Sequence, residues 1–297
     1  TDAFRVQMPV ARTPIELPPP ANPGDGEIAP PANARVITTV AEARAVLRTA
    51  GNEPIVVAID GIIRDPIRVE VNRHNVWFIG QKFTGIPGSA SGSNALSIAP
   101  CASNIHVYRC HFDKCGIALW LHGTRCRIIG NRFADCTQAI HSMWYGLSED
   151  CYIEDNIIER CSGHDVELQT HGTIDERKIL ARNIYFRGNK STGTPKGKVK
   201  MIWSIAIGHG DNIVIDGNES SGGDWAFEIM TGAVVTNNVM QDCNVGCMVY
   251  SKARDVTIGA GNRCRNVKHP MSTYHGGWTN EHKRPQWTQQ GDWMVSH

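Results

Sequence analysis

The stretch CRIIGNRFADCTQAIHSMWYG (residues 126–146) decides the fold, because variants of it recur along the chain. Each copy has an apolar-alternating strand pattern, an Asn, a few residues that often include Cys, and a second strand pattern that ends near Gly. The other copies lie at residues 104–123, 151–172, 213–232 and 233–252, and at 184–210 with an insertion. Self-similarity at a period of about 20–30 residues is typical of a stacked repeat architecture.

The spacing within each copy favours parallel β-strands. Apolar residues alternate with period two, and Val, Ile, Phe and Tyr dominate, which argues against a solenoid of helices. The units are also shorter than the ~40 residues of a propeller blade. One repeat cannot bury its apolar face alone, but parallel neighbours can do so together. We therefore predict an all-β fold, a single-stranded right-handed parallel β-helix.

Three regions are expected along the chain. Residues 1–35 are rich in Pro, Ala and Asn and are expected to form an extended arm. Residues 36–266 are expected to form the β-helix, with a capping helix at about 39–50. Residues 267–297 break the repeat, are rich in His, Trp and Gly, and are expected to form an irregular tail.

Start and stop signals support the capping helix. Thr39 stands at the N-cap position, and Glu42 follows three residues later, which is the spacing of a capping box. Ala, Arg and Leu fill the helix body, and Gly51 is expected to end it.

Composition excludes several classes of partner. The 297 residues carry a formal charge of only +1, which argues against nucleic acid or an acidic membrane surface. No apolar run approaches the roughly 20 residues of a membrane span, and residues 1–20 lack a signal-peptide hydrophobic stretch.

An Asn recurs at the same position in six copies of the repeat. The recurring Asn is expected to adopt the left-handed backbone of a tight turn and to bond its copy one coil away. Its members are Asn131, Asn156, Asn189, Asn218, Asn238 and Asn262.

Cys115, Cys136, Cys161 and Cys243 also fall at equivalent places. They predict a stack of small buried side chains. The absence of any CxxC pair argues against zinc, whereas disulfides between neighbouring coils, ~4.8 Å apart, stay open as an alternative.

The segment VITTVAEARAVLRTAGNEPIVVAIDGIIRDPIRVEVNRHNVWFIG (36–80) resembles the capping helix and opening strands of the pectate-lyase-like superfamily, and the Asn repeats are similar too. The resemblance implies a right-handed parallel β-helix used by lyases, hydrolases, epimerases and viral tailspikes. It implies a polysaccharide partner, a monomer or homotrimer, and a secreted, cell-surface or virion-associated location. It also implies that sugar chains bind along the outer face of one parallel sheet.

Strand alternation sorts the second strand of each repeat, which matches that sheet. The expected inward residues are all apolar: Ile117, Leu119, Ile140, Val166, Leu168, Ile205, Ile207, Phe227, Ile229, Cys247 and Val249. One outward, solvent-facing column is expected to hold Ala118, His141, Glu167, Ala206, Glu228 and Met248. The next is expected to hold Trp120, Met143, Gln169, Gly208, Met230 and Tyr250, with His122, Tyr145, His171 and Lys252 at the strand ends.

The first catalytic hypothesis is a polysaccharide lyase or a related uronate epimerase. Both remove the acidic proton next to a sugar carboxylate, which needs a base with a pKa near the working pH. His141 is the predicted base, with Glu167 on the adjacent coil orienting it. Tyr145 or Tyr250 would return a proton, and Lys252 would hold the carboxylate.

The second hypothesis is an inverting glycoside hydrolase. Glu167 and Glu228 are expected two coils apart, about 9.6 Å between backbones, which brackets the roughly 6.5–9.5 Å between the carboxyls of inverting enzymes. A non-catalytic glycan-binding tailspike or surface adhesin is the third hypothesis.

Further residues on this face are candidates for binding. Sugar-binding candidates are Trp120, His122, Gln169, His171 and Tyr250. Asp165, Glu167 and Glu228 are candidate ligands for a metal, with Ca²⁺ as the expected ion if one is bound. The Asp cluster and the Arg that calcium-dependent pectate lyases carry on this strand have no match here, and GHG at 208–210 lacks the companions of a polygalacturonase motif.

Overall fold

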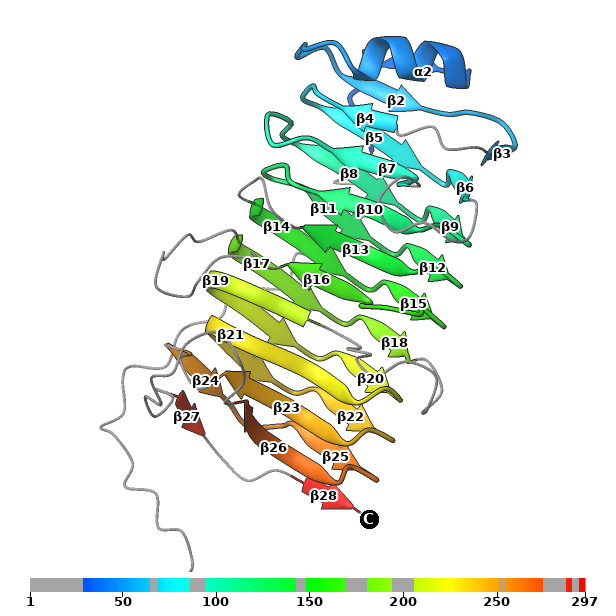
Figure 1. Ribbon diagram of the computed structural model, residues 1–297. Coiled ribbons are helices and arrows are strands. Elements are labelled where there is room, and N and C mark those ends of the chain that lie inside the picture. Colours follow the sequence, from blue (N-terminus) through cyan, green and yellow to red (C-terminus); the bar gives the residue numbers. More distant parts are fainter. Residues whose placement is uncertain are drawn as a thin grey trace, which may run out of the picture.

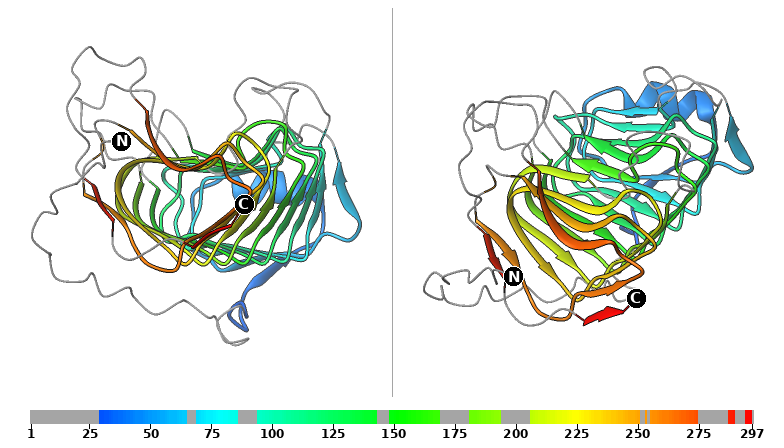
Figure 2. Two further views of the ribbon diagram at one scale, coloured as in Figure 1. Left: turned by 90° about the horizontal axis from the view of Figure 1, so that it is seen from below. Right: turned by 60° about the horizontal axis from the view of Figure 1, so that its bottom comes forward.

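The protein is a stack of parallel β-coils with a helix at one end (Figure 1). The computed structural model describes residues 29–64, 69–85, 94–142, 148–168, 181–193, 206–250, 253, 255–274, 287–289 and 294–296. The coils succeed one another along the axis from the helix to the C-terminus, and Figure 2 shows them superimposed as a tube when seen nearly along that axis.

Each coil contributes three short strands in turn. The first strands are β2 (Ile55–Val57), β5 (Val76–Ile79), β8 (Ile105–Tyr108), β11 (Arg127–Ile129), β14 (Ser148–Glu154), β17 (Ala181–Arg187), β24 (Val256–Ile258) and β27 (Trp287–Gln289), and β1 (Arg35–Ile37) pairs with β2. The second strands are β3 (Ile62–Arg64), β6 (Lys82–Thr84), β9 (His111–Asp113), β12 (Arg132–Ala134), β15 (Ile157–Glu159), β18 (Lys190–Thr192), β20 (Glu219–Ser221), β22 (Val239–Gln241), β25 (Arg263–Arg265) and β28 (Met294–Ser296). The third strands are β4 (Val69–Val71), β7 (Leu96–Ile98), β10 (Ile117–Leu121), β13 (Gln138–Ser142), β16 (Val166–Leu168), β23 (Val245–Tyr250) and β26 (His269–Tyr274).

Two longer strands, β19 (Ala206–Asp216) and β21 (Trp225–Thr236), run on from the third position of one coil into the first position of the next. They join the first and third strands into one 18-stranded sheet, whereas the second strands form a separate 10-stranded sheet. Every strand pairs in parallel with its copy one coil away. The all-β parallel β-helix predicted from the repeats is therefore confirmed.

The capping helix α2 (Val40–Leu47) closes the blue end of the stack in Figure 1. Thr39 Oγ1 accepts the Glu42 N–H at 3.2 Å, as the N-cap prediction required. The Glu42 carboxylate binds Arg35 at 2.8 Å, an exposed ion pair, and so only one half of the expected capping box is used. The helix buries Leu47 against the first coil and ends before the predicted Gly51.

The interior is filled by apolar side chains in columns along the stack, as the alternation predicted. Of the predicted inward residues in the third strands, those with described side chains are at most 3% exposed. Phe83, Phe112 and Phe133 stack with ring centroids 4.7 and 4.9 Å apart along the second strands. Ile205 lies outside the described residues. The predicted register of the core is confirmed for the described positions.

The recurring Asn residues lie at the corner between first and second strands. The Oδ1 of Asn131 accepts the Cys110 backbone N–H at 2.9 Å, and each later Oδ1 accepts the backbone N–H of the preceding Asn at 2.9–3.1 Å. Each Nδ2 donates to a backbone carbonyl inside the stack. The expected left-handed backbone, however, belongs to the residue just before each Asn, for example Gly188 (φ 61°) before Asn189. The Asn itself keeps a negative φ because its side chain must point inward to reach its copies.

The ten cysteines all lie in the described part of the chain, and none forms a disulfide there. Nine are buried and only Cys101 is exposed. Burial raises the pKa of the Cys110 thiol to about 12, which keeps it protonated and unreactive. The inter-coil disulfides left open by the sequence are thus absent, and the expected stack of small buried side chains is present.

The C-terminal segment differs from its prediction as an irregular tail. β26, β27 and β28 lie within residues 267–297 and pair in parallel with β23, β24 and β25. Backbone pairing to an existing sheet edge requires no sequence repeat, so the loss of the Asn and Cys signals hid these strands. Most of the predicted Pro-rich arm, residues 1–28, lies outside the described residues. Within the described chain, no helix is long and apolar enough to cross a membrane.

Candidate functional site

The predicted outward column lies on the third strands of successive coils. Backbone pairing places Trp120 beside His141, His141 beside Glu167, and Glu167 two coils from Glu228 with Ala206 between them. The prediction that His141 and Glu167 occupy adjacent coils is confirmed. The first member was wrong: Trp120, not Ala118, stands beside His141, because the sequence alignment placed this strand two residues away from its actual pairing with β13.

Glu167 is the centre of a polar cluster on this face that includes Gln138, His141 and His164. Its Oε2 accepts a hydrogen bond from Gln138 Nε2 at 2.7 Å and another from His164 Nδ1. His141 Nδ1 lies 3.1 Å from the same oxygen, within ion-pair range, but its N–H is not aligned for a directed hydrogen bond. One carboxylate oxygen thus faces two imidazoles and one amide.

This environment keeps Glu167 ionised. Burial alone would raise the pKa of Glu167, but hydrogen bonding and charge from His141 and His164 outweigh it and lower the pKa to about 2. A carboxylate this stable is a weak base, but it orients and stabilises imidazolium groups well.

Glu228 is in the opposite protonation state. Burial raises its pKa to about 8; a hydrogen bond from Tyr250 opposes the rise, and the negative charge of Glu167 adds to it. The Tyr250 hydroxyl donates to Glu228 Oε1, while Oε2 is buried with no hydrogen-bond partner among the described residues. At neutral pH Glu228 therefore carries a proton, and Tyr250 fixes its orientation.

An aromatic pair flanks the imidazole side of the column. Trp120 Nε1 donates to His122 Nε2 at 2.5 Å, and the Trp120 ring meets His141 edge-on with centroids 5.4 Å apart. Of the predicted sugar-binding residues, Trp120 therefore contacts His141, and His122 contacts Trp120. The Trp120 ring restricts the rotation of His141, since it covers one side of that ring.

The column was expected to face solvent, and this expectation was wrong. His141, Glu167 and Glu228 are 4%, 2% and 1% exposed although they lie on the outer side of the sheet. Side chains ~4.8 Å apart cover one another, and the hydrogen bonds just described draw them down onto the sheet. Trp120, Gln138 and His164 are half-buried and form the accessible part of the cluster.

The three candidate metal ligands do not come together. Asp165 turns away from the column: its carboxylate accepts from Ser191 of β18, and burial raises its pKa well above the ordinary value. It precedes β16 at a coil corner, where strand alternation does not fix direction. No group of three or more His, Cys, Asp or Glu side chains placed to hold a metal ion occurs among the described residues.

Four predicted site residues, Tyr145, Gln169, His171 and Lys252, lie outside the described residues. Two functional side chains were missed, Gln138 and His164. Each stands three positions before a column residue, in QAIH (138–141) and HDVE (164–167). That shared spacing was the available signal, because a residue at the strand start can fold back over the strand.

Solved structures share this architecture. An alginate lyase from Paenibacillus sp. str. FPU-7 superposes with a TM-score of 0.53 at 10% identity, covering 87% of this chain and 98% of the lyase. A pectate lyase from Bacillus sp. N165, solved with trigalacturonate, gives 0.54 at 14% identity, covering 92% of this chain and 85% of that one. This chain therefore shares the right-handed parallel β-helix fold of these two solved structures.

The fold assignment rests on architecture alone. No family model matches the sequence, and no curated protein matches it. At these identities the neighbours establish the fold and leave the chemistry to the residues of this chain.

Proposed function

We propose that the protein is a polysaccharide lyase that acts on a uronic-acid glycan through the imidazole pair on Glu167. The observation that carries this proposal is one ionised carboxylate oxygen facing the Nδ1 atoms of His141 and His164. A carboxylate at Nδ1 favours the tautomer with its hydrogen there, which leaves Nε2 as a base. The same carboxylate stabilises the imidazolium formed after proton transfer.

The reaction follows from these charges. Nε2 of His141 takes the proton from the carbon that bears the sugar carboxylate, and the electron pair forms a carbon–carbon double bond as the glycosidic C–O bond breaks. The departing oxygen takes its proton from water, because Glu228 lies three coils from His141, about 14 Å between backbones. His164 is the more exposed imidazole, at 16% against 6% for His141, and is the second candidate for the base.

The structural neighbours are consistent with an acidic substrate. Both are named lyases, and one was solved with trigalacturonate. A uronate epimerase would share the first proton transfer and differ only in reprotonating the carbon from the other side. Product analysis therefore separates these two outcomes.

One observation favours an inverting glycoside hydrolase as a second candidate. Glu167 and Glu228 lie two coils apart and titrate at about 2 and about 8, the split between carboxylate and carboxylic acid that hydrolases use. Against it, a carboxylate with a pKa near 2 is a poor base for activating water.

The test is a panel of polygalacturonate, alginate and a neutral polysaccharide, each incubated with the full chain with and without Ca²⁺. Lyase action produces the ultraviolet absorbance of an unsaturated uronate together with new ends. Hydrolysis produces reducing ends without that absorbance, and epimerisation changes the NMR spectrum of the polymer without either. Binding without any of these changes would contradict an enzyme and favour the glycan-binding hypothesis.

A further inference from the structure

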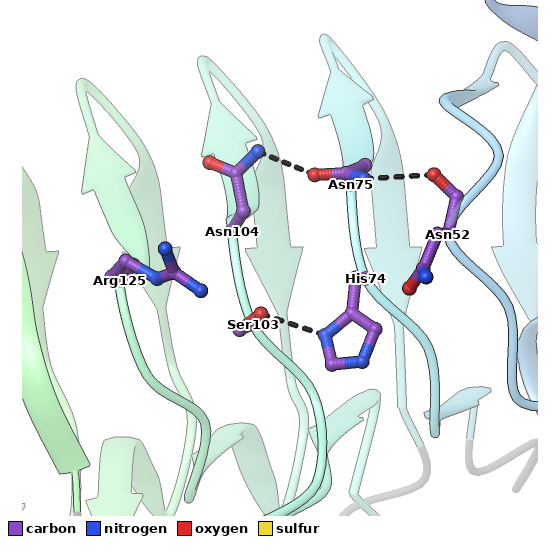
Figure 3. A pocket seen from close by; sticks show the side chains of 6 residues that line it. All are labelled: Asn52, His74, Asn75, Ser103, Asn104 and Arg125. Atoms are coloured by element: carbon purple, nitrogen blue, oxygen red, sulfur yellow. Dashed lines mark hydrogen bonds between the residues drawn. The ribbon is translucent and has the colours of Figure 1, made fainter.

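A pocket lies away from the His–Glu column, at the corner where third strands pass into the next coil's first strands. It encloses about 430 Å³ and is lined by Asn52, His74, Asn75, Ser103, Asn104 and Arg125 (Figure 3). These residues come from successive coils at the helix end of the stack. The volume is within the roughly 300–1,000 Å³ of sites that bind small molecules.

The walls of this corner pocket are prearranged by hydrogen bonds. Asn104 Nδ2 donates to Asn75 Oδ1 at 2.7 Å, and Asn75 Nδ2 donates to the Asn52 carbonyl at 2.8 Å. Ser103 Oγ and His74 Nδ1 are 2.6 Å apart on the opposite wall. Figure 3 shows Arg125 on the next coil, with its guanidinium directed toward the coil of Ser103 and Asn104.

The lining discriminates between ligand classes. All six residues are polar, one carries a full positive charge, and none is a carboxylate. Such a wall disfavours cations and apolar molecules. Amide, hydroxyl and imidazole groups match the hydroxyls of a sugar, and a guanidinium matches a carboxylate.

The charge of Arg125 is not neutralised by its neighbours in the described chain. The adjacent coil brings Glu149 and Asp150 alongside, since Arg125 N–H bonds the Glu149 carbonyl. Glu149 is engaged by Arg182 at 3.2 Å, and Asp150 accepts from Asn183 at 2.7 Å. No hydrogen bond or ion pair of the Arg125 guanidinium is found within the described residues, and the residue is exposed.

The backbone adds a second observation. Arg125 holds a left-handed conformation (φ 52°) in a corner column where Asn75, Asn104, Asn183 and Asn212 adopt the same conformation. Asn tolerates this backbone better than Arg and bonds its copies along the column, as Asn104 does to Asn75. Arg125 therefore ends this series of amide bonds and places a guanidinium at the edge of the pocket instead.

We propose that this corner pocket is an accessory site for one uronate unit of an acidic glycan, with Arg125 on the carboxylate and the amide and hydroxyl groups on the ring hydroxyls. It would hold a chain to the protein independently of turnover at the His–Glu column. The inference does not require the proposed lyase activity, because its evidence lies entirely at the corner.

The experiment measures binding of trigalacturonate to the full chain by calorimetry, with galactotriose as neutral counterpart and inorganic phosphate as a simple anion. Arg125→Gln should weaken trigalacturonate binding by roughly ten- to hundredfold, the range for a hydrogen bond to a charged group. Arg109→Gln is the matched control, because Arg109 is also exposed and left-handed (φ 52°) but lies at another corner. Ser103→Ala is a second variant and should also weaken binding.

The outcomes are separable from those of the lyase proposal. His141→Ala should retain corner binding even if all turnover is lost. Equal binding by Arg125→Gln and wild type, equal binding of galactotriose, or no binding of trigalacturonate would overturn the accessory site. Phosphate binding as tight as trigalacturonate would show an unspecific anion site and overturn the saccharide assignment.

Discussion

Two buried polar columns run along this protein, and they differ in how their hydrogen bonds are met. In the Asn column, each described amide bonds an identical side chain one coil away and a backbone carbonyl. In the His–Glu column, unlike residues face one another. His141 Nδ1 and Glu228 Oε2 are buried there without a directed hydrogen bond within the described structure.

This difference indicates that the Asn column stabilises the stack, whereas the His–Glu column is the one to which we assign the proposed function. Identical residues at one coil spacing complement one another, so the Asn column satisfies its groups and stabilises the stack. An unsatisfied buried polar atom costs about 1–3 kcal/mol and persists where it serves another purpose. The two columns should therefore respond in opposite ways to substitution.

The largest effect is expected on activity from His141→Ala. Losing the base should lower turnover by roughly 10²–10⁴-fold while the melting temperature stays nearly unchanged, because a poorly bonded buried group is removed. His106→Ala is the control, since His106 is equally buried, at 5%, on the outer side of β8. Full activity in His141→Ala together with loss in His164→Ala would transfer the role of base to His164.

Ile140→Ala should have the largest effect on stability. Ile140 is fully buried between Leu119 and Val166, and its truncation leaves a cavity worth about 2–5 kcal/mol. Ile157→Ala is the matched control, because Ile157 is 43% exposed on β15 and should cost under about 1 kcal/mol. Equal denaturation midpoints for the two variants would contradict the inward register of β13.

Asn189→Ala tests the Asn column directly. Asn189 makes four side-chain hydrogen bonds, two with Asn156 and one each with Ile153 and Asn218. Truncation leaves several buried groups without their hydrogen-bond partner, and it should lower the free energy of unfolding measured by urea denaturation by about 2–4 kcal/mol. Asn212→Gly removes only an exposed bond to Asn183 and keeps a residue that accepts the left-handed backbone there (φ 54°), so it should cost a few tenths of a kcal/mol. Similar losses in both variants would refute the contrast between satisfied interior and solvated corner.

Glu228→Gln is expected to change stability least at acidic pH. Because burial raises the pKa of folded Glu228 to about 8, the folded state binds this proton more tightly than the unfolded state. The stabilisation of the folded state by this proton is complete below about pH 4.5 and is lost as the pH rises toward 8. Glu228→Gln should thus stay within about 1 kcal/mol of wild type at pH 4.5 and lack the wild-type decline above it. Parallel unfolding free energies at all pH values would contradict a protonated Glu228.

Glu167 should show the opposite pH dependence of stability from Glu228. Burial would raise its pKa, but the hydrogen bond from His164 and the adjacent His141 imidazole outweigh burial and lower the pKa to about 2. Its stabilisation is therefore present above pH 4.5 and is lost as the pH falls toward 2. Glu167→Gln should reduce the difference in stability between pH 7 and pH 3, measured against wild type.

The sequence alone determined the periodic features of this protein. Alternation and the recurring Asn and Cys fixed the coils, the inward residues and the adjacency of His141 and Glu167, since each depends only on spacing along strands. Prediction from the sequence failed where residue spacing does not indicate the structure. Strands β26 to β28 lack the repeat signals, and Asp165 at a coil corner turned inward to Ser191.

Only the tertiary structure decided the chemistry of the face. His164 just before β16 and Gln138 on the neighbouring strand β13 both reach Glu167. The burial that separates the protonation of Glu167 from that of Glu228 depends on everything packed around them. The corner pocket likewise exists only because residues 73 positions apart, Asn52 and Arg125, are brought to one edge by stacking. The register of a strand can be read from local spacing in the sequence. The burial of charged groups and the meeting of distant side chains depend on the assembled coils.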